Sequence, residues 1–459
     1  MKDFTSNIKT RYGLTRTVAM TIGGKQGSRL TGRMFSKMMD TLAEDLEPTK
    51  EGFRISDNFI IGVLLWVDDV VSCVEGVNEQ NEMLKRIADF AIKHKLKWGA
   101  SKCRVMRVGK HRNAPSEWQL GELTISETDS YKYLGDLITN DGKNAKNLDE
   151  RKNKVSVATT TINAIAESEV LRAIESAVLL ELHEKINVPA LLTNGESWSL
   201  NKAERCKLEK IEIQTIKHMF DLPSHTPTPA IIFTFGLLYT GQRLDKKRLV
   251  YLHRILKRHE EHWTKRAFFA MNDLNIGWSK DIMQTLGTYD LPANFEEIRS
   301  MTRRQWIKLV SEKVEVRNTQ RLLSECYKVV DGVKVPKSKT AHIIDELKKD
   351  TYQRKTQDEI MTSTKNEAKM LVIARFHMLE CGLNYKGSMH EKCRTCDAID
   401  NENHRINYCP RFSHVNNYNK QEKVNYNDIF AHDSMTFKNV TEVIDRIWNV
   451  QTAHGTMRV

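Results

Sequence analysis

The sequence predicts an α+β fold, in which a short mixed region is followed by a long and mostly helical one. Residues 1–140 alternate short apolar runs and turn residues with stretches of helical periodicity. After Asn140 apolar residues recur at helical spacing almost to residue 385. Breaks between the helices of this second region are expected at Pro189, Pro223, Pro227 and Pro229.

The composition is that of a globular protein with an excess of basic residues. With 40% hydrophobic and 28% charged residues among 459, wholesale disorder is not expected. No apolar run approaches the roughly 20 residues of a membrane helix, and the first residues lack the apolar core of a signal peptide. We therefore expect an intracellular protein, nuclear or cytoplasmic, with no membrane partner. The net charge of +12 suggests a polyanionic partner.

Two adjacent aspartates lie between apolar strands. The apolar run at 59–66 is too short for a comfortable helix, and apolar character resumes at 70–74, so the sequence predicts a hairpin with Asp68 and Asp69 at its tip. Mg²⁺ prefers oxygen ligands and offsets the repulsion between neighbouring carboxylates. A solvated turn is the commoner explanation of a bare Asp-Asp pair. Other expected elements are strands at 15–22, 105–108 and 131–139, a helix at 31–46 and a helix capped by Asn78.

Four segments of distinctive sequence surround this hairpin or form part of it. GGKQGSRLTGRMFSKMMD precedes LLWVDDVV, and KLKWGASKCRVMRVGK and then YKYLGDLI follow it. This order resembles the palm of reverse transcriptases from non-LTR (LINE-type) retrotransposons. In that family a glycine-rich QG turn precedes an x-Asp-Asp hairpin, and a lysine-bearing segment and a YLG primer-grip hairpin follow. NVPALLTNGESWSLNKAERCKLEKIE is similar to the thumb of the same family.

The resemblance implies a role for each matching position. Asp68 and Asp69 would hold catalytic Mg²⁺, and Lys102 would neutralise charge on a departing pyrophosphate. The alternative for Lys102 is a solvated lysine, and the alternative for the YLG segment is an ordinary hairpin. The template or nucleotide contacts would be Gly24, Lys25, Gln26 and Gly27, and the primer grip Tyr133, Leu134 and Gly135.

The sequence departs from the family in one important respect. Family members carry another metal-binding Asp on a strand before the QG turn, whereas Asp3 is the only acidic residue before Gly24, and the fingers are absent too. Val67 is a milder departure. We therefore interpret the chain as the N-terminally truncated, C-terminal portion of an RNA-directed DNA polymerase, with an RNA template and a DNA primer or target as partners, and incomplete as a catalyst on its own.

Two alternatives belong to other classes of protein. The first is a non-enzymatic nucleic-acid-binding zinc protein derived from a retroelement, which the missing carboxylate strand favours. The second is a cellular zinc-binding interaction protein unrelated to polymerases, for which the ordered palm elements would be a coincidence.

A cluster near the C-terminal end has the spacing of a metal site, C-x₂-C-x₇-H-x₄-C. Three thiolates and one imidazole fill the tetrahedron of Zn²⁺ and leave no open position, which indicates a structural site. Chance juxtaposition is the alternative, and His390, His414 and Cys381 are rival ligands. Flanking Arg394, Arg405 and Arg411 are expected to touch nucleic acid. The predicted zinc ligands are Cys393, Cys396, His404 and Cys409.

A basic stripe is expected on a helix within residues 243–266. On a helical wheel Lys247, Arg254 and Arg258 share one side, and leucines 249, 252 and 256 fall on the other. The stripe predicts contact with a phosphate backbone, although a solvated helix face is the commoner explanation. The expected parts of the chain are a partial palm at 1–140, a helical thumb at 141–242, a basic helical region at 243–385, a CCHC zinc knuckle at 386–412 and a tail at 413–459.

Overall fold

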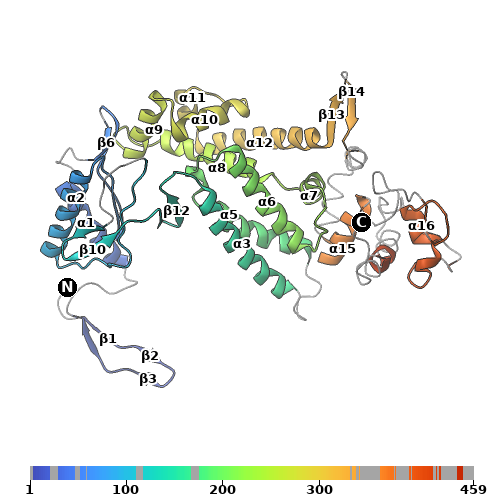
Figure 1. The fold of residues 1–459 in the computed structure, drawn as a ribbon, viewed down its shortest axis with the longest axis horizontal. Helices are drawn as coiled ribbons and strands as arrows, with labels where there is room; N and C mark the ends of the chain where they lie inside the picture. Colours follow the sequence, from blue (N-terminus) through green and yellow to red (C-terminus); the bar gives the residue numbers. More distant parts are fainter. Residues whose placement is uncertain are drawn as a thin grey trace. The chain divides into compact units, whose positions relative to one another are not determined.

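The computed structural model describes most of the chain between Phe4 and residue 447. The described residues are 4–20, 29–46, 52–57, 59–109, 117–166, 175–330, 333–337, 341, 362–376, 378, 392–393, 395–416, 420, 423–424 and 442–447. They mix helices with small two-stranded sheets, which confirms the α+β class (Figure 1). Within this part of the chain, no helix is both long enough and apolar enough to cross a membrane.

The chain divides into two compact units. Unit 1 comprises residues 1–133, 138–143 and 259–279, and unit 2 comprises 134–137, 144–258 and 280–459. The division into five parts expected from the sequence stays a prediction.

Unit 1 contains two long helices, α1 (Arg29–Leu46) and α2 (Val77–His94), which pack on each other and on small hairpins. Its core includes Leu42, Met83 and Trp118, which are almost fully buried. A third helix, α9 (Trp263–Asp273), packs against β5 and β6. The strands that lie wholly within this unit are β1 (Phe4–Ser6), β2 (Lys9–Thr10), β3 (Gly13–Leu14), β4 (Val18–Met20), β5 (Phe53–Ser56), β6 (Phe59–Ile61), β7 (Val63–Trp66), β8 (Asp69–Ser72), β9 (Glu117–Leu120), β10 (Leu123–Ser126) and β11 (Ser130–Tyr133).

Several expected elements of unit 1 differ in detail from the structure. The helix expected at 31–46 is confirmed as α1. The cap expected at Asn78 was wrong, because α2 begins after Gly76, whose backbone is extended, and the Glu79 carboxylate accepts the Glu75 N–H at 3.2 Å. The apolar run at 59–66 forms two strands rather than one, separated at Gly62.

The other expected strands are shorter than predicted. The strand at 15–22 is represented by β4, and 105–108 contributes only a bridge from Val105 to Glu127. The segment 131–139 is a hairpin of β11 and β12 (Asp136–Thr139) rather than one strand. Its turn has positive φ at Leu134 (46°) and Gly135 (92°), which a continuous strand does not allow.

Unit 2 is a helical body in which α3 lies beside α6, and α8 beside α12 (Figure 1). Its helices are α3 (Ala145–Ala166), α4 (Ser176–Leu182), α5 (Val188–Leu192), α6 (Lys202–Met219), α7 (Thr228–Thr234), α8 (Thr240–Leu256), α11 (Phe295–Ser300), α12 (Arg303–Cys326), α15 (Lys365–Arg375) and α16 (Glu402–Asn407), and α10 (Gly277–Thr288) contributes most of its length. A hairpin of β13 (Tyr327–Val330) and β14 (Val333–Pro336) follows α12 and was not expected from the sequence.

Pro189 does not break the helical path, contrary to the sequence-based expectation. The chain runs from α4 through a π-helical turn at His183–Asn187 directly into α5, where Pro189 occupies the first turn. Proline lacks an N–H donor and crowds the carbonyl four residues earlier. A π turn widens the backbone at that point and accommodates it. Pro223 and Pro227 do lie at the break between α6 and α7, whereas Pro229 lies in the first turn of α7.

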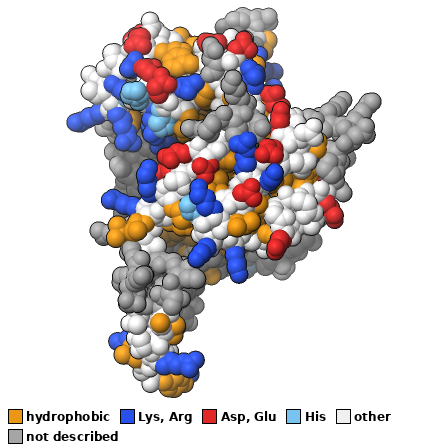
Figure 2. Space-filling model, turned by 90° about the vertical axis from the view of Figure 1, so that its left-hand side faces the viewer, with side chains coloured by type: hydrophobic (Ala, Val, Ile, Leu, Met, Phe, Trp, Pro, Cys, Tyr) orange, Lys and Arg blue, Asp and Glu red, His pale blue; other side chains and the backbone are white. Residues whose placement is uncertain are grey.

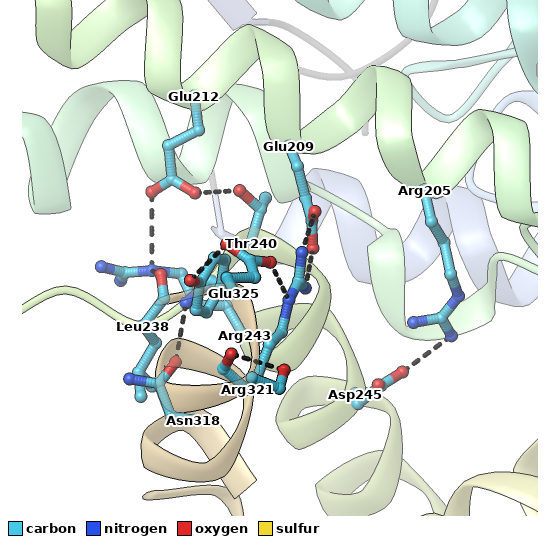
Figure 3. A network of polar contacts seen from close by, with 12 residues as sticks. Arg205, Glu209, Glu212, Leu238, Thr240, Arg243, Asp245, Asn318, Arg321 and Glu325 are labelled. Atoms are coloured by element: carbon cyan, nitrogen blue, oxygen red, sulfur yellow. Dashed lines mark hydrogen bonds and ion pairs between the residues drawn. The ribbon is translucent and has the colours of Figure 1, made fainter. Parts of the chain in front are cut away.

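Partly buried ion pairs join α6, α8 and α12 within unit 2 (Figure 3). Arg321 contacts both carboxylate oxygens of Glu209, and Arg205 pairs with Asp245 at 2.8 Å. The Glu212 carboxylate accepts hydrogen bonds from Thr240 and His183 and lies 3.5 Å from Arg243. These charges are compensated pair by pair, so they fix how the three helices pack against one another.

The same body includes the C-terminal described residues. Its core contains Leu371 of α15 together with Cys393, Cys409 and Phe412, and it also contains Ile444 from the helical turn at 442–447. The segment that carries the predicted metal ligands is therefore packed into unit 2 and is not an independent finger.

Candidate functional site

The paired aspartates lie at the tip of a tight hairpin, as expected. Strands β7 and β8 pair so that Trp66 faces Asp69, which leaves Val67 and Asp68 as the two turn residues. Both carboxylates are exposed, as are Trp66 (62%) and Val67 (45%). Val67 has a φ of 57°, which is costly for a β-branched residue. The turn therefore holds two carboxylates in solvent on a strained backbone.

Two segments expected to accompany the hairpin lie near it in unit 1. The Tyr131 hydroxyl donates a hydrogen bond to the backbone carbonyl of Lys102 at 2.8 Å. Burial and then the negative charge of Asp69 raise the pKa of Tyr131, and the same two causes raise the pKa of Tyr133. The Lys102 side chain itself is exposed. The structure thus brings the Asp-Asp hairpin, the lysine segment and the strand before the YLG turn together.

The YLG turn is held by side chains from distant parts of unit 2. Asn194 donates from Nδ2 to the carbonyl of Leu134 at 2.9 Å. The buried Arg151 donates to the carbonyl of Gly135 at 3.1 Å and to the carboxylate of Asp136. We refer to this arrangement as the turn clamp.

Further contacts of the turn clamp come from α3 and from the segment after α5. Asp136 also accepts from Trp198 Nε1 and from Asn147 Nδ2, each at 3.3 Å. Sequence reasoning missed these residues because no pattern marks them: Asn147 lies 11 residues and Trp198 62 residues from Asp136. The Asn-Gly dipeptide beginning at Asn194 was the one available signal, since it favours a turn, and Asn194 has a φ of 61°.

The four residues predicted to contact the template or nucleotide are not among those that the structure describes. Gly24, Lys25, Gln26 and Gly27 lie outside the described residues. Helix α1, which follows them, begins at Arg29.

The Cys/His cluster brings four donor atoms close enough together to hold one metal ion. One ligand atom from each of the four predicted residues lies within 4.8 Å of all the others. The two sulfur atoms of Cys393 and Cys409 are 3.7 Å apart, and Cys396 Sγ lies 3.3 Å from His404 Nε2. Zinc–sulfur bonds of about 2.3 Å place two tetrahedral sulfur ligands roughly 3.7 to 3.8 Å apart. The donor set therefore fits a metal ion such as zinc.

The thiols of the cluster differ in their electrostatic surroundings. Burial would raise the pKa of Cys393, but hydrogen bonds from the N–H groups of Thr395 and Cys396 and from His404 lower this pKa to about 6. Burial, with a hydrogen bond to Cys393, raises the pKa of Cys409 to about 11. A bound cation would favour the thiolate form of each cysteine in the cluster, including that of Cys409.

Contacts around the cluster hold its backbone. Asn401 caps α16 by accepting the His404 N–H at 2.8 Å, and Asn416 donates to the carbonyl of Cys409 at 2.9 Å. Arg405 is buried and makes a two-pronged ion pair with Asp400, so the expectation that Arg405 touches nucleic acid was wrong. Of the other two arginines, Arg411 is exposed and lies over the Phe412 ring, and Arg394 lies outside the described residues.

Of the three rival ligands, only His414 lies among the described residues. His414 is described and exposed, and it is not part of the cluster. Cys381 and His390 lie outside the described residues.

The basic stripe is only partly available to a ligand. Leucines 249, 252 and 256 are buried as expected. Lys247, however, pairs with Glu196 at 2.7 Å and donates to the Leu192 carbonyl at 2.6 Å. Arg254 is exposed and lies over the Tyr251 ring, and Arg258 follows the end of α8 at Leu256, so it is not on the helix.

Basic side chains are not gathered into one patch on the face shown in Figure 2. There, Lys and Arg lie among Asp and Glu over most of the surface. The net charge of +12 therefore does not by itself locate a binding surface.

Comparison with known proteins does not identify a family. No protein-family model matches the sequence, and no curated protein matches it significantly.

Proposed function

We propose that this chain is the C-terminal portion of an RNA-directed DNA polymerase of the non-LTR retrotransposon type, which binds RNA and DNA but is incomplete as a catalyst. One observation carries the proposal. Three segments that resemble palm elements in sequence also lie close together in the structure. The Tyr131 hydroxyl donates a hydrogen bond to the Lys102 carbonyl, and burial and then the charge of Asp69 raise the pKa of both Tyr131 and Tyr133. A coincidence of sequence order would not require this proximity.

The carboxylates have a definite role in this proposal. Asp68 and Asp69 would hold Mg²⁺, which in phosphoryl transfer stabilises the attacking and leaving oxygens. Lys102, exposed beside the hairpin, would offset charge on a leaving pyrophosphate. The turn of Leu134 and Gly135, fixed by the turn clamp, would support the primer end.

Incompleteness follows from the number of carboxylates. One or two carboxylates with waters and substrate phosphates can hold Mg²⁺, but the two-metal site of the family that the chain resembles uses a further aspartate on an earlier strand. Before Gly24 the chain contains only Asp3 as an acidic residue. We therefore expect the purified chain to bind a primer–template hybrid without extending the primer.

Primer extension on an RNA template, with Mg²⁺ and with Mn²⁺, tests the catalytic half of the proposal. The expected product is none above background for the parent and for Asp68→Asn. Template-dependent extension that disappears in Asp68→Asn would contradict incompleteness. Absence of binding to any RNA, DNA or hybrid in the same samples would contradict the proposal as a whole.

We also propose that the Cys/His cluster holds one structural Zn²⁺. The tetrahedral spacing of its four donors supports this, and a set of three thiolates and one imidazole leaves no position for a substrate. Metal analysis of the purified chain should find about one zinc per molecule. Zinc far below that value in protein purified without chelator would contradict the assignment.

A second candidate function is a non-enzymatic nucleic-acid-binding zinc protein of retroelement origin. The contrast between a closed Cys/His cluster and an open pair of carboxylates favours it. Both candidates predict binding that weakens with salt, because phosphate contacts release counterions. Primer extension does not separate them, because both predict no product. They differ in whether Asp68 and Asp69 bind Mg²⁺, which titration of Mg²⁺ into the parent and into Asp68→Asn measures.

A further inference from the structure

The N-terminal residues form an exposed two-stranded ribbon. Strand β1 pairs with β4, and β2 pairs with β3, in antiparallel register. Between these pairs Thr15 N–H donates to the carbonyl of Ile8 at 3.0 Å, and Asn7 Nδ2 donates to the carbonyl of Thr15 at 3.0 Å. Residues 4–20 are therefore one continuous ribbon (Figure 1), which we call the N-terminal ribbon.

The charge of the N-terminal ribbon has one sign. Lys9, Arg11 and Arg16 are all exposed, and residues 4–20 contain no Asp or Glu. In Figure 2 the ribbon forms the lowest part of the view, where blue and orange side chains appear without red ones. This differs from the rest of that face, where acidic and basic side chains are mixed.

Large apolar side chains are also uncovered on the same ribbon. Ile8 is 66% exposed, Tyr12 83%, Leu14 70% and Val18 55%. Arg11 lies over the Tyr12 ring at 4.6 Å, which leaves the aromatic face and the guanidinium together at the ribbon tip. Exposed apolar side chains beside basic side chains suit a ligand that offers both phosphates and flat apolar faces.

We propose that the N-terminal ribbon binds double-stranded nucleic acid, with Lys9, Arg11 and Arg16 on the phosphates. A two-stranded β-ribbon fits the major groove of B-form DNA, which is about 12 Å wide. Arginine and lysine are the usual phosphate contacts, and exposed Ile, Leu and Tyr can meet base edges and thymine methyl groups. Charge complementarity between an acid-free ribbon and a polyanion selects this partner.

Other partners fit the ribbon less well. Recognition of anionic lipid headgroups is typical of clusters of about four to eight basic residues, and the ribbon has three. Pairing with a strand of another protein is opposed by charged side chains along the ribbon, a device that protects edge strands. The proposal shares a nucleic-acid partner with the proposed function but does not depend on polymerase ancestry.

The test compares two variants of the full chain with equal loss of charge. The first is Lys9→Gln, Arg11→Gln and Arg16→Gln in the ribbon. The matched control is Lys85→Gln, Arg303→Gln and Arg304→Gln, which removes one lysine and two arginines that are exposed elsewhere. Binding to a labelled 20-base-pair DNA duplex and to an RNA–DNA hybrid is followed by fluorescence anisotropy between about 50 and 200 mM KCl. Circular dichroism checks that both variants keep the parent fold.

Three phosphate contacts set the expected size of the effect. The slope of log K against log salt should become less negative by about 2.7 in the ribbon variant, since each contact contributes about 0.9. Affinity at about 100 mM KCl should fall at least about tenfold, and the control should change much less.

Each other outcome overturns the ribbon proposal in a recognisable way. If the parent binds and the two variants behave alike, the ribbon is not the contact, while the proposed function stands. If the ribbon variant loses binding to phosphatidylserine vesicles but not to duplexes, the partner is a lipid surface. If the parent binds no nucleic acid at all, the ribbon proposal and the proposed function fail together.

Discussion

The Cys/His cluster and the Asp-Asp hairpin both carry metal-type ligands, but they differ in how much of a site they supply. The four donors of the cluster lie within 4.8 Å of one another and are mostly buried. The two carboxylates of the hairpin lie in solvent on one turn. A donor set closed by its own residues can bind a metal unaided, whereas an open pair needs ligands from elsewhere. The Cys/His cluster therefore supplies all the ligands of a metal site, whereas the Asp-Asp hairpin supplies only part of one.

The largest expected effect belongs to the cluster. Cys393→Ser, or a strong chelator, should remove the zinc and unfold the packing around α16, because structural zinc in small sites contributes about 10 to 16 kcal/mol of apparent binding free energy. Metal analysis and hydrogen exchange of residues 395–416 measure this. Cys206→Ser, at an exposed cysteine away from the cluster, is the control and should retain zinc. Equal zinc content in the two variants would show that the Cys/His cluster is not the zinc site.

The turn clamp should show the next largest effect. Arg151→Met removes the buried partner of Asp136 and of the Gly135 carbonyl, and breaking such a pair costs about 3 kcal/mol of unfolding free energy. Urea unfolding followed by tryptophan fluorescence measures the loss. The neighbouring exposed Lys152→Met should stay within about 0.5 kcal/mol of the parent. A similar small change for Arg151→Met would mean that the clamp does not hold the turn.

The ion network of Figure 3 predicts a dependence of stability on pH. Burial would raise the pKa of Glu212, but the hydrogen bond from His183 and the charge of Arg243 keep this pKa below its ordinary value of 4.5. A lowered folded-state pKa stabilises the protein above pH 4.5, and this stabilisation is lost as the pH falls below that value.

Removing the carboxylate should flatten the acid limb of the stability curve. Glu212→Gln should reduce the slope below pH 4.5 by at most about 1.4 kcal/mol per pH unit. Glu315→Gln, at an exposed carboxylate of α12, is the control and should leave the slope unchanged. Identical curves for the two variants would exclude Glu212 as the titrating group.

The smallest expected effect concerns the hairpin turn. Val67→Gly should stabilise the fold by about 1 kcal/mol, because a β-branched residue at positive φ is strained and glycine is not. Val70→Gly, in strand β8 of the same hairpin, should destabilise it instead. Thermal unfolding of both variants makes the comparison, and destabilisation by Val67→Gly would show that the turn is not strained.

The sequence predicted the features that depend on local spacing. The Cys/His donors lie within 16 residues, and the hairpin strands flank the aspartates directly, so short-range patterns indicated both. The turn clamp was beyond such reasoning, because no spacing pattern marks its residues: Arg151 lies 16 residues from Gly135, and Asn194 lies 60 residues from Leu134. The burial of Arg405 was missed for a similar reason, since its charge suggested exposure and only the ion pair with Asp400 explains its position.

The measurement that tests the account most directly combines binding and primer extension in one sample. The parent and Asp68→Asn are each given a labelled primer on an RNA template with deoxynucleotides and Mg²⁺, and bound and extended primer are quantified together. The account predicts that both proteins bind the hybrid, with affinity that falls as salt rises, and that neither extends the primer. Extension by the parent that is lost in Asp68→Asn would contradict it, as would failure of the zinc-loaded parent to bind the hybrid.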